Sequence, residues 1–162
     1  MLSNLHAVHN SNTNKVAMQF LAKATTAKSK PDAAEKFLQQ ALHLAPYNLS
    51  VRLGAYRFYF YNHRYADALP HAEFIIVHYA RQLNIPINWR TVRLEDSDFT
   101  LIGNTPGTYL QALLAWGYCN IRLGNTFLGR QAIAKVVEID PSDRFNAKAI
   151  LDILEHNSTD LP

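Results

Sequence analysis

One segment constrains the fold more than any other, and it lies in the last third of the chain. From Tyr109 the sequence reads YLQALLAWGYCNIRLGNTFLGRQAIAKVVEIDPSDR. Apolar residues recur at helical spacing as far as Leu123-Gly124, and a second helical period then runs to Asp140-Pro141. Glycine is favoured directly after a helix, and proline cannot continue one. The segment therefore predicts two antiparallel helices joined by a tight turn.

Similar helical periods fill most of the remaining chain. They predict helices over 15–27, 33–44, 49–61, 65–80 and 145–156. Pro70 lies inside the fourth of these, so that helix is expected to start near Ala68 or to bend there. Residues 1–12 are polar and unpatterned, and we expect a disordered or frayed terminus.

Residues 83–108 break the helical period. The segment LNIPINWRTVRLEDSDFTLIGNTPGT contains two prolines and two glycines. The alternation at 89–94 and the β-prone residues at 99–102 indicate a non-helical excursion, either a hairpin or an extended segment. Long excursions of this kind are often functional. The sequence leaves open whether this one covers a groove, forms a hairpin or makes an interface.

A repeat becomes visible when Pro46 and Pro141 are set as equivalent ends. The stretch that ends at Pro46 then has Leu21-Ala22, Ala34 and Ala41 at three positions. The stretch that ends at Pro141 has Trp116-Gly117, Gly129 and Val136 at the equivalent positions. Between them lies the sequence Tyr65-Ala66-Asp67-Ala68. Small residues at these positions are expected where two helices approach closely.

This pattern resembles the tetratricopeptide repeat (TPR), a pair of antiparallel helices about 34 residues long. The resemblance implies an all-α fold in which three helix pairs form a superhelix closed by a capping helix. The implied ranges are units at about 15–48, 49–82 and 110–143, a capping helix at 144–156, and one domain over 13–162. The middle unit departs from the family pattern, with Ile75 for the second alanine and no final proline.

The resemblance also implies a function and a surface. A TPR-like protein of this size would be a non-catalytic adaptor or scaffold that binds a partner protein or peptide on its concave face. The run YRFYFY at 56–61 is too aromatic for all its residues to face a core, and Arg and Tyr are favoured at interfaces. The residues expected to bind the partner are Lys23, Arg57, Phe60, Tyr61, Tyr118 and Arg122.

Other ways of binding stay open beside the adaptor. Small three-repeat proteins include chaperones that hold a secreted client, and an exposed groove could pair two copies into a homodimer. Residues 1–64 carry eight Lys and Arg against two Asp and Glu, a balance that steers acidic partners and could attract nucleic acid. The lysines are dispersed rather than clustered, which favours a protein partner over nucleic acid.

Signatures of other classes of protein are missing from the sequence. No Gly-rich phosphate loop, nucleophile elbow or pair of carboxylates points to an enzyme or a cofactor. His71 and His78 are spaced too widely for a helical metal site, and Cys119 lies at a core position. There is no signal peptide and no apolar stretch near 20 residues, so we expect a cytoplasmic protein without a membrane partner.

Overall fold

The fold is entirely helical over the part of the chain that the structure describes. The structure is a computed structural model that describes the backbone of residues 2–101 and 104–159. Its helices are α1 (Leu2–Thr26), α2 (Pro31–Leu44), α3 (Leu49–Tyr61), α4 (Tyr65–Leu83), α5 (Asn104–Arg122), α6 (Thr126–Ile139) and α7 (Ala147–Thr159), with the short 3-10 helices η1 (Trp89–Thr91) and η2 (Leu94–Asp96). The all-α prediction is confirmed. None of the described helices combines the length and the apolarity needed to cross a membrane.

The chain forms two compact units, residues 1–62 and 63–162. Unit 1 contains α1 to α3, and unit 2 contains α4 to α7. The boundary falls between the two helices of the unit expected at 49–82. Each unit is described by itself, and the single array expected from the sequence stays a prediction.

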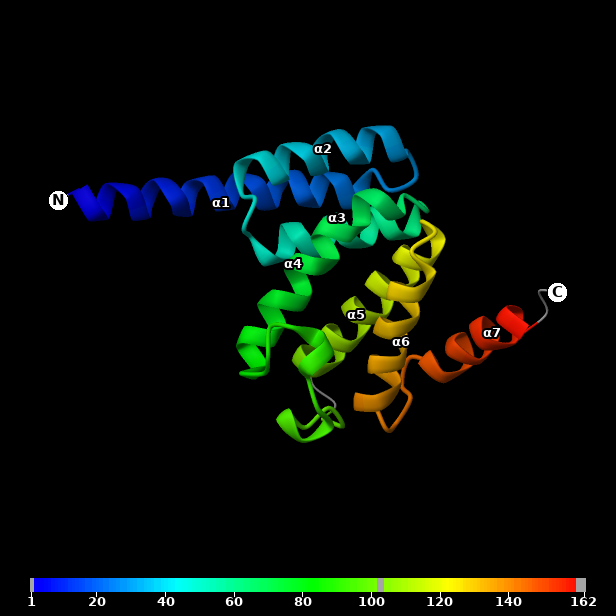
Figure 1. Ribbon diagram of the computed structural model, residues 1–162. Helices are drawn as coiled ribbons and strands as arrows, with labels where there is room; N and C mark the ends of the chain where they lie inside the picture. The colour runs from blue at the N-terminus through cyan, green and yellow to red at the C-terminus, as the bar shows by residue number, and fades with distance from the viewer. Residues whose placement is uncertain (1, 102–103, 160–162) are drawn as a thin grey trace. The chain divides into compact units, whose positions relative to one another are not determined.

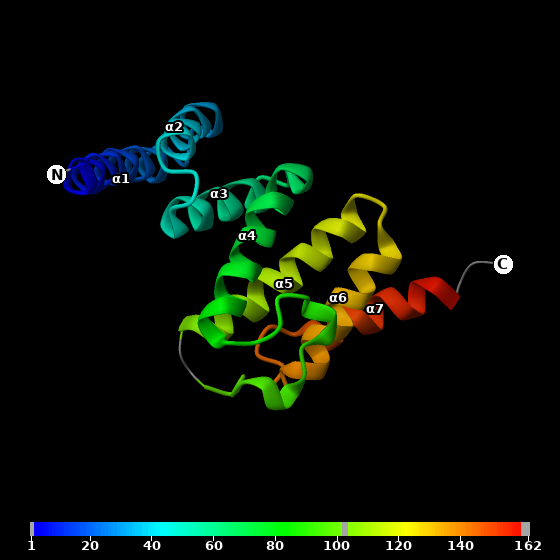
Figure 2. The same ribbon diagram turned by 60° about the vertical axis from the view of Figure 1, so that its left-hand side comes forward.

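In unit 1, α1 and α2 lie side by side and run antiparallel, as Figure 1 and Figure 2 both show. Their shared core is small and apolar, consisting of Ala17, Ala41, Ala45 and Val51 with the partly buried Phe20, Leu21, Leu42 and Leu44 around it. Ala34 is also fully buried. The next helix, α3, begins at a side-chain cap, because the Asn48 side chain accepts a hydrogen bond of 3.2 Å from the Val51 amide.

The N-terminal helix is longer than the sequence predicted. α1 begins at Leu2 and covers residues 2–12, where a frayed or disordered terminus was expected. The first proline of the chain is Pro31 and the first glycine is Gly54, so no strong helix breaker interrupts this stretch. Polar composition alone therefore misplaced the start of the helix.

In unit 2, α5 and α6 cross at a pair of glycines. A Cβ atom on Gly129 would lie 2.5 Å from Cγ1 of Ile121 and closer still to the carbonyl oxygen of Gly117. A Cβ on Gly117 would lie 3.0 Å from the Gly129 carbonyl oxygen. The backbones meet because neither residue has a side chain, and the close contact expected at Gly129 is confirmed.

The turn between α5 and α6 depends on a polar residue in the core. Asn120 is 3% exposed, and its amide nitrogen donates to the Trp116 carbonyl at 3.0 Å. Its side-chain oxygen accepts from Asn125 at 3.2 Å, while Gly124 takes a left-handed φ of 90°. Asn120 thus closes the turn through hydrogen bonds to Trp116 on one side and to Asn125 on the other.

Helix α4 runs through Pro70 without ending. It begins at Tyr65 rather than near Ala68, so the later start was wrong. Pro70 lies in the second turn and is exposed. A proline there removes a single backbone hydrogen bond near the helix start. The buried residues that follow on α4, such as Ile75 and Tyr79, compensate by packing against the rest of the unit.

The non-helical excursion expected at 83–108 is shorter than predicted, because α4 runs to Leu83 and α5 already begins at Asn104. Its described residues, 84–101, contain no strand. Side chains from far along the chain bind its carbonyl groups instead. Lys135 on α6 donates to the Val92 carbonyl at 3.0 Å. Arg144 donates to the carbonyls of Phe99 and Leu101. Since the described residues of the excursion form two short 3-10 helices and no strand, the hairpin alternative is wrong.

The C-terminal helix α7 begins at Ala147 and packs on α6 (Figure 1). Its first residue is buried, whereas Ile153 in its middle is 61% exposed. This is the helix expected at 144–156.

Candidate functional site

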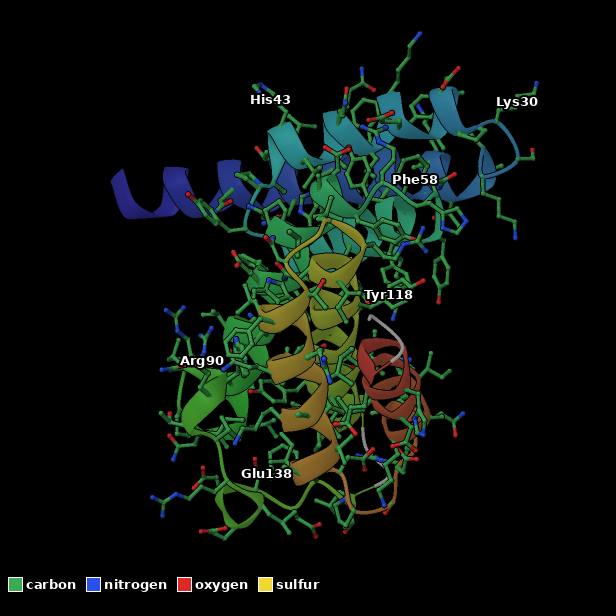
Figure 3. The ribbon with its side chains drawn as sticks, turned by 45° about the vertical axis from the view of Figure 1, so that its right-hand side comes forward. Lys30, His43, Phe58, Arg90, Tyr118 and Glu138 are labelled. Carbon is green, nitrogen blue, oxygen red and sulfur yellow. The ribbon has the colours of Figure 1, made fainter. Side chains whose placement is uncertain are left out.

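An open groove of about 400 Å³ runs along unit 1 between α1 and α3. Its floor is apolar and is formed by Leu21 and Ala24 of α1, Leu38 of α2, and Phe58 of α3, which Figure 3 labels. Leu38 is 1% exposed and Ala24 is 8% exposed. The floor is therefore the outer surface of the unit's own core.

Gly54 keeps this groove shallow and open. It lies on α3 at the floor, and a Cβ atom built on it would be 2.5 Å from Cδ1 of Leu21. The side chain of Leu21 occupies the space that a larger residue at 54 would need. A side chain at residue 54 would therefore displace the end of the Leu21 side chain.

The rim of the groove combines an aromatic ring with two cations. Tyr61 is 74% exposed, although its ring packs edge-on against Phe60 at 5.7 Å between centroids. Lys28 and Arg57 also line the groove and are exposed. No acidic side chain is among the groove's lining residues. The rim can accordingly offer cationic donors and a ring face to a bound segment.

The spacing of α3 explains which of its aromatic residues reach the groove. Residues 54, 57, 58 and 61 follow the i, i+3, i+4, i+7 pattern, so they share one face of the helix. Tyr59 points elsewhere, because it is 6% exposed and its hydroxyl donates to Glu35 Oε1 at 3.2 Å. Phe60 is half-buried and packs on Tyr56 at 6.1 Å.

Of the six residues expected to bind a partner, the structure thus places Arg57 and Tyr61 together in one groove. Phe60 packs edge-on against the Tyr61 ring but does not line the groove. Phe58 and Lys28 were missed. The i, i+3, i+4 stripe from Gly54 could have identified Phe58, whereas Lys28 follows α1 and no periodicity points to it.

Lys23 lies in a different part of unit 1. Its ammonium group is 5.3 Å from the centre of the Phe20 ring and 5.9 Å from that of Phe37, which are cation–π distances. It lines a separate shallow groove that also includes Lys30, labelled in Figure 3. The structure therefore does not bring Lys23 to the groove of Arg57.

Tyr118 and Arg122 lie in unit 2 and form a stack with Tyr65. The Arg122 guanidinium donates to the Tyr118 hydroxyl at 3.1 Å and lies 5.2 Å from the centre of the Tyr65 ring. This hydrogen bond, which Arg122 donates to Tyr118, raises the pKa of Arg122. Figure 3 labels Tyr118 on α5. Tyr118 and Arg122 contact each other in unit 2, whereas Arg57 and Tyr61 belong to unit 1.

A smaller pocket of about 310 Å³ lies in unit 2 between η1 and α6. Its lining includes Arg90 and Glu138, both labelled in Figure 3. Arg90 lies 4.4 Å over the Trp89 ring, and Lys135 is paired with Glu138 at 2.8 Å. The cations of this pocket are therefore already engaged within the unit.

Side chains that could ligate a metal are not gathered in the described part of the chain. No group of three His, Cys, Asp or Glu side chains lies close enough there to hold a metal ion. Burial raises the pKa of the Cys119 thiol to about 11, and the thiol is fully enclosed. Cys119 therefore lies in the core, where the sequence placed it.

The fold and the groove define an all-helical protein with a preformed surface groove between two helices. The chain belongs to the same family as a protein of Azotobacter chroococcum mcd 1 that is described as an uncharacterized 19.8 kDa protein in the nifW 5′ region. The two sequences are 36% identical over 133 residues, which cover 79% of this chain and 73% of the relative. No family model matches the chain, and no solved structure matches it.

Proposed function

We propose that this protein is a non-catalytic interaction module that binds a segment of a partner protein in the unit 1 groove. One observation carries the proposal. The groove has an apolar floor, and its rim presents Tyr61, 74% exposed, beside two cations. Exposed aromatic and arginine side chains next to apolar surface are typical of protein interfaces.

We also propose that the helix pairs are TPR-like. The positions at which the resemblance expects close packing are fully buried or free of side chains, namely Ala34, Ala41, Gly129 and Val136. This supports the assignment of the pairs α1–α2 and α5–α6. An experimental structure of the full chain tests whether three pairs form the expected superhelix.

The name of the relative suggests the first partner to test. That name places its gene in the 5′ region of nifW. Proteins encoded side by side often act together, so the nifW product is the first candidate partner for this chain as well. Binding of the two purified proteins can be measured by biolayer interferometry.

A selection from a displayed library of random peptides tests the module without assuming a partner. We expect peptides that bind with a Kd of about 1 to 100 μM, the range of modest grooves. Tyr61→Ala should weaken binding of these peptides by about tenfold, since exposed aromatic anchors often contribute more than about 1 kcal/mol.

Tyr47→Ala is the matched control. Tyr47 is an equally exposed tyrosine of unit 1, at 81%, and lies outside the groove. Its replacement should leave peptide binding unchanged. A library that yields no binder, or binders that lose affinity equally in both variants, would overturn the proposal.

A further inference from the structure

We propose that the ligand of the unit 1 groove is an acidic segment with an apolar anchor, whose carboxylates pair with Lys28 and Arg57. This inference rests on the proposed function and specifies the chemistry of the partner. The groove supplies two kinds of contact, apolar along its floor and cationic along its rim, and a segment that satisfies both must carry both kinds of side chain.

The two rim cations are not engaged, and among the unengaged cations described in unit 1 they are the ones that line this groove. Within the described residues, the side chains of Lys28 and Arg57 make no hydrogen bond or ion pair. By contrast, Lys135 pairs with Glu138 and Arg144 pairs with Asp140. Two cations without a carboxylate partner beside apolar surface indicate a site for carboxylates from outside the chain.

The net charge of unit 1 also favours an acidic ligand. Residues 1–62 contain seven Lys and Arg but only two acidic residues, Asp32 and Glu35, which gives a net charge of +5. Glu35 already accepts hydrogen bonds from Tyr59 and Gln39. The field around the groove is therefore positive, and it raises the association rate of acidic segments over neutral ones.

The floor sets the second requirement on the ligand. Leu21, Leu38 and Phe58 present carbon surface with few polar atoms, and the groove volume of about 400 Å³ holds a few side chains rather than a folded domain. Burying one leucine or phenylalanine there contributes more binding free energy than an exposed ion pair. A purely acidic, polar segment should therefore bind weakly.

Fluorescence anisotropy with four labelled probes tests this chemistry on the full chain. The first peptide alternates Leu and Phe with Asp and Glu. The second has Ser in place of every Leu and Phe, the third has Lys in place of every acid, and the fourth probe is a single-stranded oligonucleotide. We expect the first to bind about tenfold or more tightly than each of the others. Its affinity should fall as salt is raised.

The cations are tested by Lys28→Gln and Arg57→Gln. Each should weaken binding of the first peptide by about threefold, since an exposed ion pair contributes up to about a factor of five. Lys15→Gln is the matched control, because Lys15 is an exposed lysine of α1 that does not line the groove. It should leave the affinity within error of the parent protein.

The outcomes separate this inference from the function it rests on. Selected peptides that bind in a Tyr61-dependent way but are neutral or basic would overturn the acidic ligand and leave the interaction module intact. Tighter binding of the oligonucleotide would overturn the acidic ligand in favour of nucleic acid. An equal loss with Lys15→Gln would show a general charge effect rather than a site. No binding by any selected peptide would overturn both.

Discussion

At the scale of single residues, the helix crossing in unit 2 depends on two missing side chains. Gly117 and Gly129 let the backbones of α5 and α6 meet, and either Cβ would press on the other glycine's carbonyl oxygen. Backbone atoms cannot rotate away from such a contact as a side chain can. The cost of a methyl group here must therefore be met by moving a helix.

Gly129→Ala should lower the free energy of unfolding by about 2 kcal/mol. Overpacking lowers the free energy of unfolding by up to about 3 kcal/mol. The higher helix propensity of alanine offsets about 1 kcal/mol of this loss. Urea unfolding followed by tryptophan emission measures the change. Gly107→Ala is the control, because a Cβ there meets only side-chain atoms at 3.9 Å. That variant should be neutral or slightly more stable.

The buried thiol leads to a second prediction for one residue. Burial raises the pKa of Cys119 from 9.0 to about 11, and the side chain is 0% exposed. Since the thiolate is the reactive form, the native protein should react with a thiol reagent at pH 8 far more slowly than free cysteine does. Denaturant should restore the fast rate. Fast labelling of the native protein would contradict this burial.

At the scale of elements, the C-terminal end of the excursion after α4 is held by one arginine. Arg144 reaches the carbonyls of Phe99 and Leu101 and pairs with Asp140, which is 1% exposed. Asp140 also accepts from the Arg144 amide at 2.9 Å. One side chain thus joins the end of the excursion to the turn between α6 and α7.

Arg144→Ala should destabilise unit 2 by about 3 kcal/mol, because it leaves the buried Asp140 carboxylate without its cation. Hydrogen exchange should also become faster over residues 97–101. Arg93→Ala is the control, since the Arg93–Glu95 pair is exposed on both sides and should contribute close to nothing. Unchanged exchange in the Arg144 variant would show that the excursion is held by its apolar contacts instead.

How much the sequence could predict follows from the range of the interactions involved. The helices and the contact at Gly129 follow from periodicity and residue size, which act locally. Arg57 and Tyr61 of the groove could be named together from the sequence, because they lie four positions apart on one helix face. Phe58 and Lys28 were not named. The path of the excursion could not be predicted, since it depends on Lys135 and Arg144, more than forty residues away along the chain.

At the scale of the whole molecule, charge and buried ionisable groups are divided unevenly between the units. Unit 1 carries a net charge of +5, and residues 63–162 carry nine Lys and Arg against eleven Asp and Glu. Both tryptophans, Trp89 and Trp116, lie in unit 2 together with Cys119 and Tyr109. Tryptophan emission therefore reports on unit 2 alone.

Since these buried groups lie in unit 2, we predict that unit 2 loses folding stability at alkaline pH. Burial raises the pKa of Cys119 from 9.0 to about 11 and also raises the pKa of Tyr109 above its usual 10.0. A raised pKa in the folded state means that stability is complete below pH 9 and declines as the pH rises further. For Cys119 the loss by pH 11 is about 2 kcal/mol.

Urea midpoints from tryptophan emission should therefore fall between pH 8 and pH 11. Cys119→Ala provides the control, because it removes the buried thiol that titrates in this range. At pH 8 the urea midpoint of this variant should be lower than that of the parent protein, because the substitution leaves a small cavity. Its midpoint should then decline less steeply as the pH rises. Equal slopes in the two proteins would show that Cys119 does not contribute to the alkaline transition.

The absence of a side chain at Gly54 has a consequence for the family. A glycine codon becomes an alanine codon by a single base change, and the added methyl group would push Leu21 toward the groove. Helix α3 would persist, since alanine favours helix more than glycine does. A relative with alanine at this position could therefore keep the fold and lose the ligand. If the proposed groove binds, we expect residue 54 to be the first position to compare when relatives of this chain are tested for binding.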